Sequence, residues 1–343
     1  MRLKHYCAVI SIVAAAPAMA QVPQSAPAIV TERDAAPGDQ LQAYSNWIEQ
    51  MGAAFQMGQA SVEAIQPKLA AALNSKGAPA ATAEARAALA NARSALRRSS
   101  AVVSALKAPA FEQLHLPSDL SAAAIQSGVL TLNANRTKMI DAMEDLLKAL
   151  QQRDLPAALR ANVQLLAAGG QQLDLLILLT KARAVASHDH VADRVFFEVV
   201  AIIYRGQRQM LRIATPAGLV ADSKVSGDLD QLAAELELLL GRERPLLESA
   251  ISLGDSQITD ARARGADTSG LDLVQRIQVG ARDLFPQGEA VAAALRETSN
   301  SLRRGTPTAT ELTAIIGRFA GLERALAQIQ LRAIHTLNRT PLS

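Results

Sequence analysis

The chain has 343 residues, of which 49 % are hydrophobic and 3 % aromatic, and its formal net charge at neutral pH is +3. Arg2 and Lys4 supply two of these charges, so the chain after residue 20 has a formal charge of +1. A near-neutral protein lacks the positive charge that nucleic-acid binding usually requires, and we therefore exclude a nucleic-acid partner.

The first twenty residues have the layout of a cleavable secretory signal peptide. Arg2 and Lys4 precede an apolar run over residues 6–16, and residues 17–20, Pro-Ala-Met-Ala, form a small-x-small cleavage sequence. The apolar run is about half of the ~20 residues needed to cross a bilayer, so we expect cleavage before Gln21 and not a membrane anchor. The sequence thus predicts a periplasmic or secreted protein with no transmembrane segment after cleavage.

The single cysteine, Cys7, lies inside this segment and would be lost with it. The mature chain would then contain no thiol, which excludes disulfides, cysteine nucleophiles and thiolate metal sites. Residues 21–37 are rich in Pro and Ala without a sustained period, and they are predicted to form a flexible linker.

From residue 38 onward, apolar residues recur in threes and fours, which is the spacing of the seam of an α-helical bundle. The first row runs from Leu41 to Leu69, and Pro67 is expected to kink this helix or to end it early. A proline-containing connector is predicted over 108–120. Further helices of this half are predicted over 82–106, 125–150 and 159–180.

A helix over about 189–213 is apolar on nearly every side and is expected to be the most buried one. A turn follows at 215–218. Pro245 is expected to bend the next helix. Three helices complete the chain: one over 229–253, one that begins near Asp272 and is interrupted at 285–288, and one over 312–337.

These elements predict an all-α fold with about eight long antiparallel helices, arranged as four helical hairpins in up-and-down bundles. Two units are expected, a first helical bundle over 38–183 and a second over 188–340. The turns at 76–79, 153–156 and 304–307 look alike, with the turn at Pro216 as a looser member, which indicates either internal duplication, the favoured interpretation, or only the shared chemistry of short turns. The helices are joined by short turns that contain Pro79, Pro156, Pro216 or Pro307.

Potential metal ligands cluster in His188-Asp189-His190, with Asp193 one turn later. His190 and Asp193 are three residues apart, so they share a helix face, and His188 is placed to reach in from the preceding turn. The same residues fit a solvated helix start with Asp189 as the N-cap, which is the favoured interpretation. We predict no metal site, and His188, His190 and Asp193 are the candidate ligands if one exists.

Arg136 and Glu243 each occupy a position where the row of apolar residues calls for an apolar side chain. A buried charge is unfavourable unless it is paired, so the two residues would pair across the bundle or line a polar pocket. The favoured interpretation is that both extend their long side chains to water at the edge of the bundle.

Tyr44, Trp47 and Phe55 concentrate the few aromatic residues on the first helix. They would form either a groove for an apolar ligand or a partner helix, or the packed core of the first hairpin, which is the favoured interpretation. The acidic pairs Glu144-Asp145 and Glu235/Glu237 lie on helices rich in other charges and are predicted to be solvated.

No phosphate-binding glycine loop, zinc-protease, serine-hydrolase or dinucleotide-binding motif occurs in the sequence. We therefore predict no catalytic residue, no cofactor and no enzyme activity. The predicted function is an exported, non-catalytic helical bundle of the cell envelope that serves as an interaction or structural module, with a protein partner or with itself. The alternative is a periplasmic bundle that binds or senses a ligand or metal between its helices.

Overall fold

The computed structural model describes residues 47–338, except 48–49, 56, 59, 76–77, 108–121, 187–189 and 216–217. The described chain is almost entirely helical, which confirms the predicted all-α fold. The segment 47–63 is helical where it is described. After it come α3 (Ile65–Asn74), α4 (Pro79–Ala105), α5 (Ala122–Gln152), α6 (Leu155–Ala186), α7 (Val191–Met210), the short 3₁₀ helix η2 (Leu211–Ile213), β1 (Ala214–Thr215), β2 (Gly218–Leu219), α8 (Ser223–Ala263), α9 (Ser269–Ala281), α10 (Leu284–Arg303) and α11 (Ala309–Asn338). The predicted signal peptide, linker and 108–120 connector lie outside the described residues.

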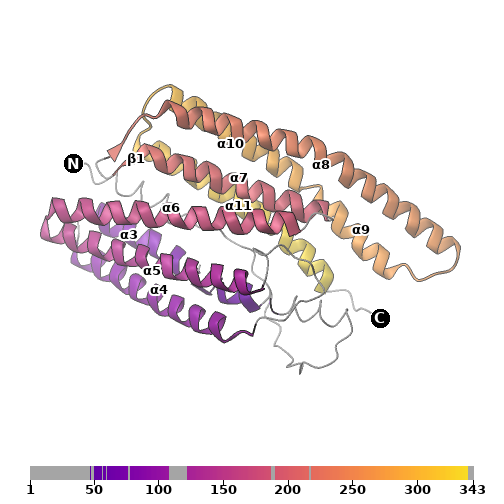
Figure 1. Ribbon diagram of the computed structural model, residues 1–343, viewed down its shortest axis with the longest axis horizontal. Helices are drawn as coiled ribbons and strands as arrows, with labels where there is room; N and C mark the ends of the chain where they lie inside the picture. The colour runs from indigo at the N-terminus through magenta and orange to yellow at the C-terminus, as the bar shows by residue number, and fades with distance from the viewer. Residues whose placement is uncertain are drawn as a thin grey trace.

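The long helices lie side by side along the long axis of the molecule (Figure 1). In the first half, neighbours in sequence are neighbours in space: α3 packs on α4, α4 on α5 and α5 on α6. In the second half, α8 packs on α9 and α10, and α11 packs on α9 and α10. Short turns between long helices produce this up-and-down arrangement.

Helix α7 connects the two halves. It packs on α6 from the first half and on α8, α10 and α11 from the second, and one continuous core of apolar side chains runs through both. Every residue from Val195 to Tyr204 is buried except Glu198, which is half-buried. The strongly apolar helix of the sequence is therefore the central helix of the molecule. The division into two bundles near 184–188 falls at the α6–α7 connection and stays a prediction.

Local sequence signals set the helix ends. Pro79 and Pro156 lie in the first turns of α4 and α6, where a missing backbone N–H removes no helical hydrogen bond. Asp154 accepts a hydrogen bond of 2.9 Å from a backbone N–H of the first turn of α6. Thr308 and Glu311 form a capping box at the start of α11, in which each side chain accepts from the backbone N–H of the other residue.

Two helix interruptions that we predicted from prolines occur a few residues before those prolines. The first row of apolar residues is interrupted at Ala64, and α3 begins one residue later, so Pro67 lies in a first turn and the helix ends early. The second interruption falls at 282–283, ahead of the predicted 285–288, and Pro286 lies in the first turn of α10. In both cases the chain places proline where no N–H is required.

Helix α8 continues without a break through Pro245, and the predicted bend there stays a prediction. An internal proline costs a helix about 3 kcal/mol. Leu240 and Leu247, before and after it, are both buried in the core, and this packing offsets part of that cost. The turn after α7 is a two-stranded antiparallel hairpin of β1 and β2, which the sequence did not predict.

Among the described helices, α6 contains a segment, Leu155–Lys181, that is long and apolar enough to cross a membrane by length and composition. This segment packs on α5 and α7, and the core helices of soluble proteins pass the same test. The absence of a membrane span after residue 20 stays a prediction.

Candidate functional site

A set of buried polar residues lies where the two halves of the molecule meet. We call Arg136 of α5, Tyr204 of α7 and Glu323 of α11 the central polar cluster. Their relative exposures are 0 %, 0 % and 4 %. Three helices that are far apart in sequence thus place ionisable groups in the interior, where each needs a partner.

The contacts within the central polar cluster are short. The Tyr204 hydroxyl donates a hydrogen bond of 2.5 Å to Oε1 of Glu323. The guanidinium carbon of Arg136 lies 4.4 Å from the ring centroid of Phe55, a distance at which a cation is attracted to an aromatic face. The exposed Glu63, on the same helical segment as Phe55, also attracts the Arg136 charge. The cluster therefore ties segment 47–63, α5, α7 and α11 together.

Burial changes the protonation of these groups. Desolvation lowers the pKa of Arg136 to about 10, although electrostatic interactions with Glu63 and Tyr204 act in the opposite direction. Desolvation raises the pKa of Glu323 to about 8 against the hydrogen bond from Tyr204, and the negative charge of Glu63 raises it further. At neutral pH Arg136 is charged and Glu323 is mostly protonated. The net charge of the central polar cluster is therefore close to the single positive charge of Arg136.

Two buried amides extend the polar interior. Gln207 lies one turn after Tyr204 on α7 and is fully buried, and Gln172 of α6 is 2 % exposed. Neither amide has a hydrogen-bond partner for its nitrogen or its oxygen within the described part of the chain. Such groups are usually satisfied by internal water, and we expect water molecules at these two side chains.

Glu243 of α8 is the second buried charge, with 1 % exposure. Its carboxylate accepts a hydrogen bond from Arg194 of α7 and another, of 2.8 Å, from Nε of Arg242. The prediction that Arg136 and Glu243 reach water is therefore wrong, because both are enclosed. The alternative that they pair with each other is also wrong, since Glu243 pairs with these two arginines.

The candidate metal ligands are not brought together among the described residues. His188 and Asp189 lie outside them. The N-cap residue of α7 is His190, which is exposed, so the interpretation that Asp189 occupies this position is wrong. No group of three or more His, Cys, Asp or Glu side chains able to hold a metal occurs in the part of the chain that the structure describes.

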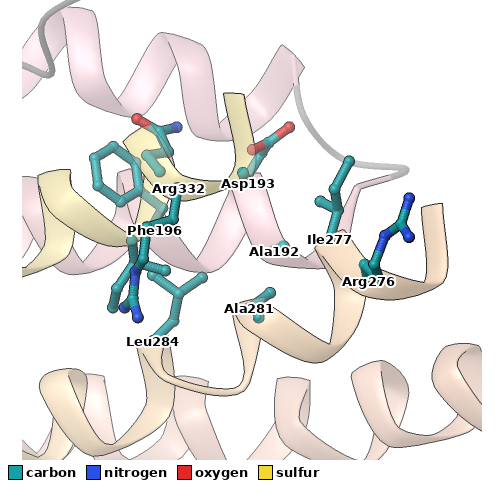
Figure 2. Close-up of a pocket in the computed structure, with 12 residues that line it drawn as sticks. Ala192, Asp193, Phe196, Arg276, Ile277, Ala281, Leu284 and Arg332 are labelled. Atoms are coloured by element: carbon teal, nitrogen blue, oxygen red, sulfur yellow. The ribbon is translucent and has the colours of Figure 1, made fainter. Parts of the chain in front are cut away.

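Asp193, in the first turn of α7, instead lines a pocket of about 120 Å³ between α7, α9, α10 and α11. The interior is mostly apolar, with Phe196 and Leu284 among its walls. Arg276 and Arg332 lie on opposite sides of it, with Ala192 and Ala281 between them (Figure 2). The walls of this pocket combine an apolar interior with groups of both charges.

The other polar and aromatic candidates have structural surroundings. Trp47 and Phe55 are buried in the core, which confirms core packing for them, and Tyr44 lies outside the described residues. Arg93 binds Glu144, and Arg205 and Arg296 bind Glu235 and Glu237. These carboxylates are all more than 40 % exposed, so the predicted solvated faces are confirmed for them.

Sequence reasoning identified Arg136 and Glu243 but missed Tyr204 and Glu323. Tyr204 is the last residue of an apolar run, so its hydroxyl did not stand out as a polar group in the sequence. Glu323 lies four residues after Phe319 and three before Leu326, which are both buried, so a charge stands at the spacing of the seam. That spacing could have identified Glu323 as a buried charge.

The chain matches no family model, no curated protein and no solved structure. Its function is therefore argued from its own residues. The central polar cluster joins four helical segments without forming a described cavity, and the pocket beside Asp193 and the outer surface of α8 are the places where another molecule could bind.

Proposed function

We propose that the protein is an exported, non-catalytic structural module of the cell envelope that associates with a second copy of itself through the outer face of α8. The N-terminal pattern of basic residues, apolar run and small-x-small sequence supports export. The exposed row of leucines on α8 is the observation that carries self-association.

The outer face of α8 consists of the exposed residues of this helix between Leu238 and Leu253. Leu238, Leu246 and Leu253 are 77 %, 48 % and 60 % exposed. They are eight and seven residues apart, so they lie on one side of the helix. An exposed row of large apolar side chains marks a surface that binds another protein. Two of the other exposed residues in this stretch are charged, Arg242 and Arg244, and Arg244 points to the flank that packs on α10; the rest are small or uncharged: Gly241, Pro245, Ser249 and Ser252.

Charge distinguishes this face from the flank of α8 that packs on α10. That flank carries ion pairs to α10, among them Arg296 with Glu237 and Arg244 with Glu289. On the outer face the charged residue is Arg242, which bonds the buried Glu243. A charged surface on the partner would lose its hydration on the outer face of α8 without gaining ion pairs. The partner surface that fits this face is therefore itself uncharged.

A second copy of α8 supplies such a surface with matching spacing. Residues 238 and 253 are nearly equidistant from 246, so a two-fold axis near Leu246 places Leu238 of one copy opposite Leu253 of the other. The same axis relates Gly241 to Ala250 and Arg242 to Ser249, and these small residues leave room for the leucines and for the arginine side chain. The row is thus complementary to itself in an antiparallel helix pair.

Sedimentation equilibrium of the mature chain from Gln21, isolated from the envelope fraction of its host, tests the proposal. A single helix pair buries less than the about 800 Å² per partner of a standard interface, so we expect a reversible dimer that forms as concentration rises. The variant Leu238→Glu/Leu253→Glu should be monomeric. Leu178→Glu, at a 56 % exposed leucine of α6, is the matched control and should dimerise normally.

A wild-type chain that remains monomeric throughout would overturn the proposal. Equal dimerisation by the double variant and the wild type would exclude the outer face of α8 as the interface. Crosslinking of Leu238 to a different envelope protein, with no dimer, would identify another occupant and refute self-association.

A further inference from the structure

We infer that the pocket between α7, α9, α10 and α11 is a binding site for a small uncharged apolar molecule, with at most about six non-hydrogen atoms. The site is separate from the outer face of α8 and does not depend on self-association.

The volume of the pocket limits the ligand to a small molecule. It is about 120 Å³, which is below the about 300 Å³ at which pockets for drug-sized molecules begin. A cavity of about 150 Å³ that is lined by Leu, Ile and Phe binds one benzene molecule. A ligand of this pocket therefore has about the size of benzene or is smaller.

The buried part of the lining is apolar. Its members are Phe196 of α7, Ala281 at the end of α9, Leu284 of α10 and Ile329 of α11. A water molecule needs two to four polar partners to be held in a cavity, and these side chains offer none. The buried lining therefore favours an apolar ligand over water.

The charged residues of the lining lie at its edge and have partners within the protein. Asp193, Arg276 and Arg332 are all exposed, and in Figure 2 Asp193 and Arg276 point away from the buried lining residues that are labelled there. Arg332 bonds Asp283 at 3.0 Å. Arg276 interacts electrostatically with Asp272, and Asp193 also has a partner of its own. A charged ligand would lose its hydration against the buried lining without gaining a partner there, so the ligand is uncharged.

The exposed residues also give the ligand a way in. Arg276 and Gly280 both line the pocket and are exposed, so the pocket is partly open along α9. Exposed side chains change rotamer within picoseconds to nanoseconds. A small molecule can therefore reach the buried lining without movement of a helix.

Ala192 gives a way to fill the pocket. It lines the pocket from the first turn of α7, where it is half-buried against the core. Ala192→Leu adds three carbon atoms, which would occupy the space of the ligand. Ala157 is the matched control, because it is half-buried against the core in the first turn of α6 and lies outside the pocket lining.

The test is a titration of the mature protein with benzene, followed by saturation-transfer NMR. The comparison ligands are piperidine, which is a cation at neutral pH, and butanoate, which is an anion. Both have as many non-hydrogen atoms as benzene, so charge is what differs. We expect saturable binding of benzene with a Kd of about 1 mM and at least about tenfold weaker binding of the two ions.

The variants assign the binding to the pocket. Ala192→Leu should abolish benzene binding, whereas Ala157→Leu should retain it. Benzene should raise the midpoint of thermal unfolding of the wild type and of Ala157→Leu but not that of Ala192→Leu. Far-UV circular dichroism establishes that each variant is folded. If Ala192→Leu does not fold, Ala333→Leu, at a half-buried lining residue of α11, replaces it.

Two results would overturn the inference outright, namely no saturable binding of benzene to the folded wild type and undiminished binding by the folded pocket-filling variant. Loss of binding in Ala157→Leu as well would exclude this pocket as the site. Equal binding of benzene and either ion would refute an uncharged ligand. Failure of this site would leave the dimer measurement unaffected, and loss of the dimer would leave this titration unaffected.

Discussion

Arg136 and Glu243 are both buried charges in rows of apolar residues, yet the protein accommodates them differently. Glu243 is held by two arginines that keep contact with water, since the side chains of Arg194 and Arg242 are 21 % and 68 % exposed. Arg136 lies against Phe55 among the buried groups of the central polar cluster. Glu243 thus belongs to a charge network that reaches the surface, whereas Arg136 belongs to the junction between the halves.

The difference teaches that the surroundings of a buried charge, and not its burial alone, should set the effect of losing it, since Arg136 contacts the enclosed Phe55 and Tyr204 and has Glu63 as its one exposed charged neighbour among the described residues. A partner that reaches water can be rehydrated after the loss, but groups enclosed in the interior cannot. The substitutions at Arg136 and Glu243 should therefore differ in size, although both residues are almost completely buried.

The largest effect is expected for Arg136→Ala. It removes a fully buried side chain, leaves a cavity and takes the positive charge away from Tyr204 and Glu63, so the free energy of unfolding should fall by about 4 kcal/mol. Arg136→Met, which fills most of the volume without a charge, should lose less than half of that. Urea denaturation followed by circular dichroism measures both. Equal losses for Ala and Met would mean that packing volume is unimportant at this position.

The next effect is a pH dependence that comes from Glu323. Its pKa of about 8 in the folded protein exceeds the value of 4.5 for an unperturbed group, so the folded state binds more protons between these pH values. Stability from this group is complete below about pH 4.5 and is lost as the pH rises through about 8, with a total of about 3 kcal/mol after allowance for relaxation around the charge.

Glu323→Gln should remove this part of the pH dependence, because the amide does not titrate. Urea denaturation of both proteins at pH 5, 6, 7 and 8 gives the difference in free energy of unfolding. The wild type should lose its advantage over the variant as the pH rises. Parallel curves would contradict the proposed protonation of the central polar cluster.

The smallest of the three effects is expected for Glu243→Gln. The neutral amide keeps the shape and can still accept hydrogen bonds, and Arg194 can be hydrated at its exposed part. The free energy of unfolding should fall by about 1–2 kcal/mol. A loss as large as that of Arg136→Ala would break the comparison between the two sites. Arg242→Gln, which removes the more exposed partner, should change stability by less than about 1 kcal/mol.

Much of the fold could be predicted from local signals. Apolar rows, together with Pro79, Pro156 and Pro307, predicted most helices within a few residues of their observed ends. The continuation of α8 through Pro245 could not be predicted in this way, because it depends on packing against α10 that no single stretch of sequence contains. The same holds for the β1–β2 hairpin, whose strands are two residues each.

The candidate sites were predictable only in part. A charge within an apolar row pointed to Arg136 and Glu243, but periodicity does not say which residues come from the other helices. The partners Tyr204 and Arg194 are both on α7, and only the three-dimensional packing distinguishes their roles. Asp193 was singled out for metal binding, whereas its position at the pocket depends on Arg276 and Arg332, more than eighty residues later in the chain.

The α8–α9 hairpin projects beyond the ends of the other helices, as Figure 1 shows at its right edge. α9 is held by α8 and α11, so fewer neighbours resist its opening than resist that of α7. Backbone amides of α9 should exchange with deuterium through local openings, long before those of α7, whose exchange requires global unfolding.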